Sequence, residues 1–135
     1  MKTPRGIANN NPGNIRKTAI QWQGETLDDP AFETFISPEY GIRAMWKCLR
    51  TYERNWGPQT VAEIIGRWAP PVENDTGAYV RSVCAYTGFE PEHRVDLTNK
   101  GHCIVLAQAI IRHENGQQPY GSAIFERAWD RLNEK

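Results

Sequence analysis

The sequence has few cysteines and no excess of charge of either sign, and both shortages exclude classes of protein. Three Cys occur in 135 residues, too few for the cysteine-dense disulfide scaffolds typical of small secreted domains. Sixteen Lys and Arg balance sixteen Asp and Glu, so the formal net charge is zero. A neutral chain has no long-range field that would gather nucleic acid or an anionic membrane surface. We therefore expect no nucleic-acid partner.

Long apolar runs are missing as well. The longest uninterrupted ones, such as residues 104–107, fall far short of the roughly 20 residues that a membrane-spanning helix needs. Residues 1–14 are polar and lack the apolar core of a secretory signal. We therefore expect no membrane partner. We also expect that the protein is made in the bacterial cytoplasm without a signal peptide, and that all three Cys are structural thiols.

Several catalytic and ligand-binding motifs are also missing from the sequence. It contains no G-x-S-x-G, P-loop or G-x-G-x-x-G motif, which leaves nucleophile-elbow hydrolases and nucleotide enzymes without support. The residues that could bind zinc do not repeat a standard ligand spacing; they are His93, His102, Cys103 and His113. We therefore expect no metal ion and no cofactor.

The composition that remains is that of one folded domain. Apolar residues make up 39% of the chain, with five Trp and five Tyr, and a chain of this length buries roughly two-thirds of its unfolded surface without a staple. No repeat, low-complexity run or linker divides it. We predict a single domain over residues 1–135, with loop and hairpin in 1–36 and helices in 37–133.

The first part reads as turns and short strands. Turn-forming Asn, Pro and Gly crowd residues 9–14. β-type segments follow around residues 15–18, 20–23 and 32–36. These segments predict one small antiparallel β-hairpin.

Helical periodicity begins after Ser37-Pro38-Glu39, a sequence typical of a helix start. Four further helices are predicted. The first begins at a capping box of Thr60 and Glu63 and stops at Pro70-Pro71, and the second has a cap at Asn74 or Asp75 and ends near Gly88. The third, over 99–115, has a cap at Thr98 and an exit at Gly116, and the last covers about 122–133. The fold class that follows is α+β, mostly helical, with about five helices and one small β-hairpin.

Glu114 is the carboxylate most suited to catalysis. The apolar stripe of the 99–115 helix, when continued at a spacing of three or four residues, reaches Glu114 in its last turn. Partial burial and the negative end of the helix dipole both disfavour a charged carboxylate there, as a general acid near neutral pH requires. The alternative is a terminal Glu turned into water or bonded to a loop amide.

Other residues could complete a site. A second carboxylate could come from the hairpin, although acids in such positions are commonly turn formers or solvated; the candidates are Glu25, Asp28, Asp29 and Glu33. Flat aromatic rings near amide side chains suit a sugar ligand, although part of this aromatic supply, including Trp46 and Trp129, would be core.

Four segments of the sequence resemble a group of small phage and prophage proteins. They are residues 5–16, which contain Asn9-Asn10-Asn11-Pro12-Gly13-Asn14-Ile15-Arg16, and residues 22–24, 35–44 and 67–76. Members of the group are labelled virion structural or lysozyme-like proteins. The resemblance covers roughly residues 5–116 and implies a lysozyme-like domain.

A more distant resemblance supplies a mechanism. Flagellar-type glucosaminidases and lytic transglycosylases have a catalytic Glu at a helix end, then an Asn-rich loop and a Trp-x-Gly hairpin, and later a Tyr near the Glu. Here residues 10–15 and 22–24 look like the loop and hairpin, and Tyr79 could be the Tyr, but no Glu precedes them. In a circular permutant Glu114 would take that place, about 30 residues before Asn10 through joined termini.

These resemblances predict an enzyme that cleaves the glycan strand of bacterial peptidoglycan at the cell wall, as a muramidase, glucosaminidase or lytic transglycosylase with Glu114 as general acid. The 10–14 loop should lie beside the carboxyl end of the 99–115 helix, and the two termini on one side. The alternatives are a non-catalytic phage virion or wall-binding module, with other virion proteins as partners, and an antibacterial wall-degrading effector with an immunity protein. The residues expected to line the substrate groove are Asn10, Asn11, Trp22, Trp68 and Tyr79.

Overall fold

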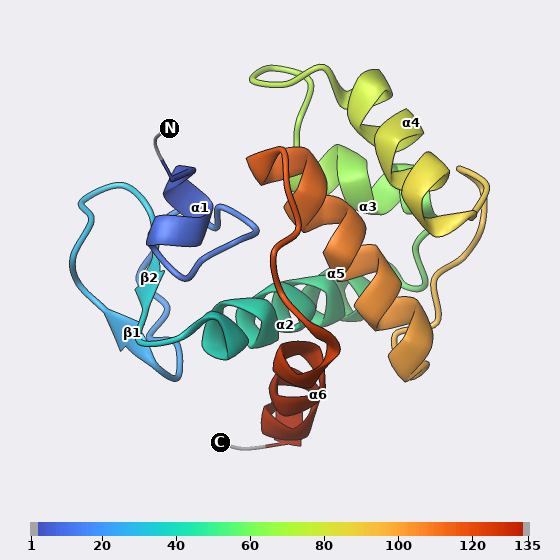
Figure 1. The fold of residues 1–135 in the computed structure, drawn as a ribbon. Coiled ribbons are helices and arrows are strands. Elements are labelled where there is room, and N and C mark those ends of the chain that lie inside the picture. Colours follow the sequence, from blue (N-terminus) through green and yellow to red (C-terminus); the bar gives the residue numbers. More distant parts are fainter. Residues whose placement is uncertain (1–2, 134–135) are drawn as a thin grey trace.

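The computed structural model describes residues 3–133 and confirms a mostly helical α+β architecture (Figure 1). The predicted proximity of the termini concerns residues 1–2 and 134–135, which lie outside this range. In chain order the elements are α1 (Arg5–Ala8), β1 (Glu25–Thr26), β2 (Thr34–Phe35), α2 (Pro38–Trp56), α3 (Val61–Trp68), α4 (Thr76–Thr87), α5 (Lys100–Asn115), α6 (Ser122–Asp130) and a 3₁₀ turn (Arg131–Asn133).

Side-chain caps begin α3, α4 and α5, whereas the cap positions of α1, α2 and α6 make no side-chain hydrogen bond to the helix. Thr60 and Glu63 form the predicted capping box at the start of α3, and Asp75 caps α4 by accepting from the Ala78 amide at 3.0 Å. The cap of α5 is Asn99, which accepts from the His102 amide. Thr98 was the predicted cap, but its hydroxyl and amide both donate to Asp96.

The amino-terminal third differs in detail from the prediction. Residues 5–8 form the one-turn helix α1, although this segment was predicted to be loop. The sequence could not indicate this helix, because a single turn is too short to show helical periodicity of apolar residues. Antiparallel strands β1 and β2 pair Glu25 with Phe35, and one isolated bridge joins Arg16 to Phe32. The predicted strand over residues 20–23 is not formed.

The core is built between α2 and α5. Helix α4 packs on α5, and α6 packs on α2, so that both central helices are covered (Figure 1). Trp46, Ile65 and Phe125 are among the fully buried side chains at the centre. The indole nitrogen of Trp46 donates to the Cys103 carbonyl at 2.9 Å, which ties α2 to α5.

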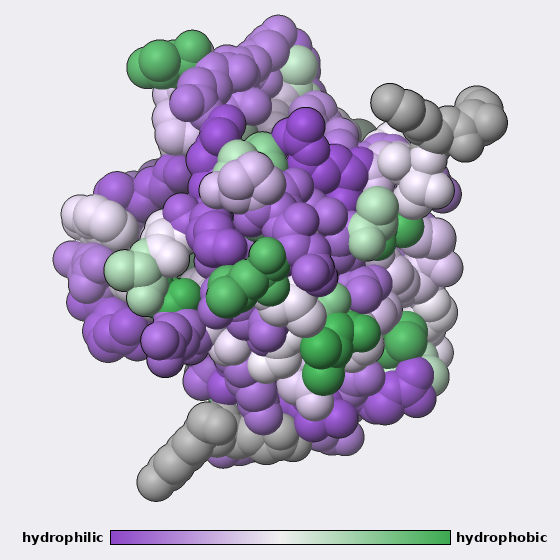
Figure 2. Space-filling model, turned by 90° about the vertical axis from the view of Figure 1, so that its left-hand side faces the viewer, coloured by the Kyte–Doolittle hydropathy of each residue, from purple (hydrophilic) through white to green (hydrophobic). Residues whose placement is uncertain are grey.

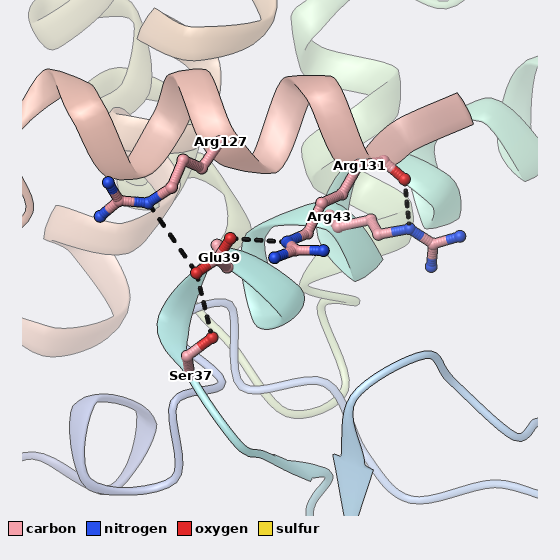
Figure 3. Close-up of polar contacts among 5 residues, drawn as sticks. All are labelled: Ser37, Glu39, Arg43, Arg127 and Arg131. Atoms are coloured by element: carbon pink, nitrogen blue, oxygen red, sulfur yellow. Dashed lines mark hydrogen bonds and ion pairs between the residues drawn. The ribbon is translucent and has the colours of Figure 1, made fainter. Parts of the chain in front are cut away.

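A cluster of charges fixes α6 against the start of α2. Glu39 accepts from Arg131 Nε at 2.6 Å and lies 3.9 Å from Arg127 Nε, while the Arg43 Nε donates to the Arg131 carbonyl at 2.9 Å (Figure 3). The Glu39 side chain is only 13% exposed, and it also stands in the first turn of α2, where the helix dipole favours an anion. Glu39 is therefore an anchor of the fold.

The surface carries scattered apolar residues. Val72 and Leu27 are the most exposed of the large ones, and Figure 2 shows green groups separated by purple, hydrophilic residues on the side that carries the hairpin. Within residues 3–133 no helix combines the length and hydrophobicity needed to cross a membrane. The same residues contain no cluster of three His, Cys, Asp or Glu side chains arranged to hold a metal ion.

Candidate functional site

A groove of about 530 Å³ lies between the amino-terminal loop and the segment that joins α3 to α4. Residues 13–16, Thr18 and Phe32 supply one group of lining residues, and residues 68–70 and 72–74 supply another. Cys48 and Tyr52 of α2 also line it, together with Glu114. The groove therefore brings together segments from the beginning, middle and end of the chain.

Glu114 lines this groove, with both carboxylate oxygens bonded. The Asn14 Nδ2 donates to Oε1 at 2.8 Å, and the Tyr79 hydroxyl donates to Oε2 at 2.7 Å. Glu114 is half-buried in the last turn of α5, which Gly116 ends in the left-handed conformation. Since a carboxylate has about four acceptor positions, two bonds fix its orientation and leave acceptor positions for a ligand.

Tyr79 reaches Glu114 from α4 and is itself buried, at 1% exposure. Burial, and then the charge of Glu114, raise the pKa of this phenol well above its ordinary value of 10. The hydroxyl therefore stays protonated and remains a donor. Tyr79 is absent from the lining of the groove, so its position fits an orienting donor better than the sugar-stacking ring that the sequence suggested.

The loop before Asn14 is locked onto the end of α5. Buried Asn115 donates from Nδ2 to the Pro12 carbonyl at 2.8 Å and to the Ile111 carbonyl at 2.9 Å. This confirms the prediction that the 10–14 loop lies beside the carboxyl end of the helix over 99–115. Asn115 thus fixes the distance between the elements that carry Asn14 and Glu114.

Trp68 lies in the groove, as predicted for a substrate-binding ring. It is half-buried at the end of α3 and faces Gly13: a Cβ on Gly13 would lie 2.7 Å from the Trp68 ring and 2.8 Å from Met45 Cγ. Only glycine lets the loop approach this ring so closely.

Trp22 was also predicted to line the groove, and the structure places it elsewhere. It lines a separate hollow with Ile20, Gln21, Gln23, Arg43 and Lys47. The segment over residues 20–23 turns away as a loop instead of continuing the hairpin, and this carries the indole out of the Glu114 groove.

Asn10 and Asn11 shape the loop and do not line the groove. Asn10 adopts φ 54° and donates from Nδ2 to the Phe35 carbonyl at 3.0 Å. Asn11 is fully buried, and its amide group bonds the Ile15 amide and the carbonyls of Ile15 and Glu33. These contacts leave the Asn11 side chain no face for a ligand.

The four hairpin acids proposed as second carboxylates lie outside the groove lining; they are Glu25, Asp28, Asp29 and Glu33. Asp29 accepts from the backbone amides of Ala31 and Phe32 at 2.8 and 3.0 Å, and these bonds lower its pKa. It is a turn former, as the alternative interpretation held.

Glu33 is fully buried in the hairpin. Burial and the neighbouring Glu25 carboxyl raise its pKa to about 7. The two residues lie on one face because Glu25 pairs with Phe35 of β2, and Glu33 precedes Phe35 by two positions in extended backbone. This pair is a titrating feature of the hairpin and does not meet Glu114.

Arg16, Phe32 and Glu73 are among the lining residues that were not singled out from the sequence. Arg16 Nη2 and Glu73 Oε2 lie 3.4 Å apart. Glu73 is the second acid of the groove lining within residues 3–133. Arg16 and Glu73 both belong to segments that carry the resemblance to phage proteins, so the sequence did mark these segments. Their contact could not be predicted, because the two residues are 57 positions apart.

Comparison with known proteins relates the chain to a phage protein. No protein-family model matches the sequence. The chain is 43% identical over 121 residues to Protein P5 of Pseudoalteromonas phage PM2, and the match covers 86% of this chain and 74% of that protein. With this identity and coverage, the chain belongs to the family of phage proteins that includes Protein P5.

Proposed function

We propose that the protein cleaves the glycan strand of bacterial peptidoglycan, with Glu114 as the general acid. The observation that carries the proposal is the setting of Glu114: a half-buried carboxylate in a groove, held by Asn14 and Tyr79. A general acid must be held within hydrogen-bond reach of the oxygen that it protonates. Trp68 in the same groove offers a flat apolar surface for a sugar ring.

In this mechanism Glu114 gives its proton to the glycosidic oxygen as the bond to the leaving sugar breaks. Asn14 and Tyr79 donate to the carboxylate that forms, so the negative charge is stabilised as it develops. The positions of both donors are fixed before the reaction, because Asn115 holds the loop and burial holds Tyr79.

The groove favours a route without an enzyme nucleophile. The hairpin acids are outside the groove lining, and Glu73 is exposed and paired with Arg16. In lytic transglycosylation the substrate's own C6 hydroxyl attacks the anomeric carbon, and Glu114 takes the hydroxyl proton after giving its own to the leaving group. This route consumes no water and needs one carboxyl group, unlike a two-carboxylate retaining mechanism.

The test is the Glu114→Gln variant on purified peptidoglycan. Gln keeps the size of Glu but has no acidic proton, and general acid catalysis is worth about 10² to 10⁴ in rate. We expect the variant to unfold at an unchanged temperature, to bind peptidoglycan, and to release muropeptides at least about 100-fold more slowly. Exposed Glu92, changed to Gln, is the matched control and should keep full activity.

Product masses then separate the routes. Anhydro-sugar ends indicate transglycosylation, and reducing ends indicate hydrolysis. An active wild type whose Glu114→Gln variant is equally active would show that another group, first of all Glu73, is the acid.

A second candidate is a non-catalytic phage virion or wall-binding module, favoured by the membership in a family that contains a phage protein. Its partners would be other virion proteins or the peptidoglycan itself. A module of either kind releases no muropeptides across pH 4 to 8. An antibacterial effector would catalyse the same reaction as the proposed enzyme, and would have an immunity protein as a further partner.

A further inference from the structure

We propose that Arg16 is a specificity residue that binds a carboxylate of the ligand, which makes the groove selective for glycan strands that carry peptide stems. The inference rests on the proposed function and adds a recognition site to it. Peptide stems bear free carboxylates, whereas the lactyl carboxyl of each stem-bearing muramic acid is neutral because it forms the amide bond to the stem. A guanidinium is the side chain best matched to a carboxylate, since its parallel N–H groups bind both oxygens.

The backbone on both sides of Arg16 is fixed. Arg16 forms an antiparallel bridge with Phe32, and the neighbouring bonds from the Lys17 amide to Ala31 and from the Glu33 amide to Ile15 are both 3.0 Å long. A residue between two such bonds cannot slide along the hairpin. The guanidinium is therefore presented to the groove from a rigid base.

The side chain is also held over an aromatic ring. The Arg16 guanidinium carbon lies 5.0 Å from the centre of the Phe32 ring, and that of Arg5 lies 4.6 Å from the same centre. Cation–π contacts of this kind orient a guanidinium and leave its edge of N–H donors available. Two cations therefore stand at the Phe32 end of the groove.

The one side-chain acid that Arg16 contacts within residues 3–133 marks where a carboxylate fits. Glu73 Oε2 lies 3.4 Å from Nη2, and the two side chains are 60% and 64% exposed. An ion pair this long and this exposed contributes little. A guanidinium has five N–H donors, so a ligand carboxylate can bind beside Glu73 or displace it.

The test compares two substrates: glycan strands with their peptide stems, and the same strands after the stem carboxylates have been converted to neutral amides with a carbodiimide and methylamine. We expect the wild type to have a higher kcat/KM on the strands with free stem carboxylates, and Arg16→Gln to reduce this preference about tenfold. Arg54→Gln, at an exposed Arg at the end of α2, is the control and should keep the preference. Glu73→Gln removes the competing carboxylate and should strengthen the preference.

Binding of both strands to Glu114→Gln measures the same preference without turnover. Equal losses of the two substrates in Arg16→Gln, or an unchanged preference in both assays, would overturn the proposal. A wild type that cleaves neither strand would contradict the proposed function, while the binding ratio of the two strands would still decide the role of Arg16.

Discussion

Glu114 is held by two donors that stand far from it in the sequence. Asn14 precedes it by 100 positions and Tyr79 by 35. Neither donor belongs to α5, so the orientation of the carboxylate depends on tertiary packing. The two donors should therefore be positioning residues, whose loss changes turnover more than substrate affinity.

Removal of the Tyr79 hydroxyl tests this role. Tyr79→Phe keeps the buried ring and deletes the bond to Glu114 Oε2; a bond to a charged group is worth about 1.5 to 3 kcal/mol. We expect kcat to fall about 10- to 100-fold with a smaller change in KM, measured by muropeptide release.

Tyr120→Phe is the matched control for this variant. The Tyr120 hydroxyl is buried without a hydrogen-bond partner in the described part of the chain, so its loss should leave kcat unchanged and stability equal or slightly higher. Equal effects of the two variants on kcat would refute a specific role for Tyr79.

Glu33 makes stability depend on pH. Its pKa of about 7 in the folded protein lies above the ordinary 4.5 because of burial and Glu25. The folded state therefore holds the proton more tightly, and this stabilisation is complete below pH 4.5 and lost as pH rises through about 7. Glu33→Gln cannot ionise, so relative to wild type it should gain about 1 kcal/mol or more between pH 5 and pH 8.

Urea unfolding of both proteins at the two pH values measures this gain. Asp28→Asn, at an exposed acid of the same hairpin, should show no such gain. A stability difference between Glu33→Gln and wild type that is the same at pH 5 and pH 8 would contradict the assignment.

The sequence predicted some residues of the candidate site and placed others in the groove that do not line it. Glu114 could be found because helical periodicity places it on the apolar face. The roles of the three loop amides could not be told apart, because Asn10 and Asn14 take positive φ while Asn11 turns inward. These conformations depend on contacts outside the loop, such as the bonds from Asn11 to the Glu33 carbonyl and from Asn14 to Glu114 of α5. Asn14, which contacts Glu114, was therefore not distinguished from its neighbours.

The same contrast holds for whole elements. Helix starts follow from side chains within four residues, so the starts of α2, α3 and α4 were predicted closely. The hairpin strands are only two residues long each, and part of their backbone bonding goes to loops, as in the bond from the Phe35 amide to the Asn9 carbonyl. Strands this short show no alternation of polar and apolar residues from which they could be predicted.

The junction between the loop and α5 should couple stability to activity. Asn115→Ala removes both Nδ2 bonds and leaves the buried Pro12 carbonyl without this donor, at a cost of about 1 to 3 kcal/mol. Because the loop carries Asn14, we expect muropeptide release to fall as well. Chemical denaturation and activity of the same preparation measure the two effects.

Asn99→Ala is the control at the other end of the same helix. Loss of this cap costs about 1 kcal/mol and leaves the Glu114 end of α5 in place. Its activity should match that of wild type. An Asn115→Ala variant that is destabilised yet fully active would show that the junction serves folding alone.

At the scale of the whole molecule, the groove exists only when the amino-terminal loop, the α3–α4 segment and α5 are assembled. Helix α5 contacts α1, α2 and α4, so a separate opening of α5 would expose core residues from most of the fold. The site should therefore be lost together with the global structure and not before it.

Labelling of Cys103 can test this coupling. The thiol is 1% exposed near the start of α5, and burial raises its pKa to about 12, so only an opened molecule presents a reactive thiolate. In a Cys48→Ala, Cys84→Ser background without urea, we expect labelling at least about 1000-fold slower than in the unfolded chain, with a urea dependence equal to that of global unfolding. Faster labelling while circular dichroism remains native would reveal a local opening of α5. The helix that carries Glu114 would then be mobile in the folded protein, and the two bonds from Asn14 and Tyr79 would have to be formed anew each time the groove closes.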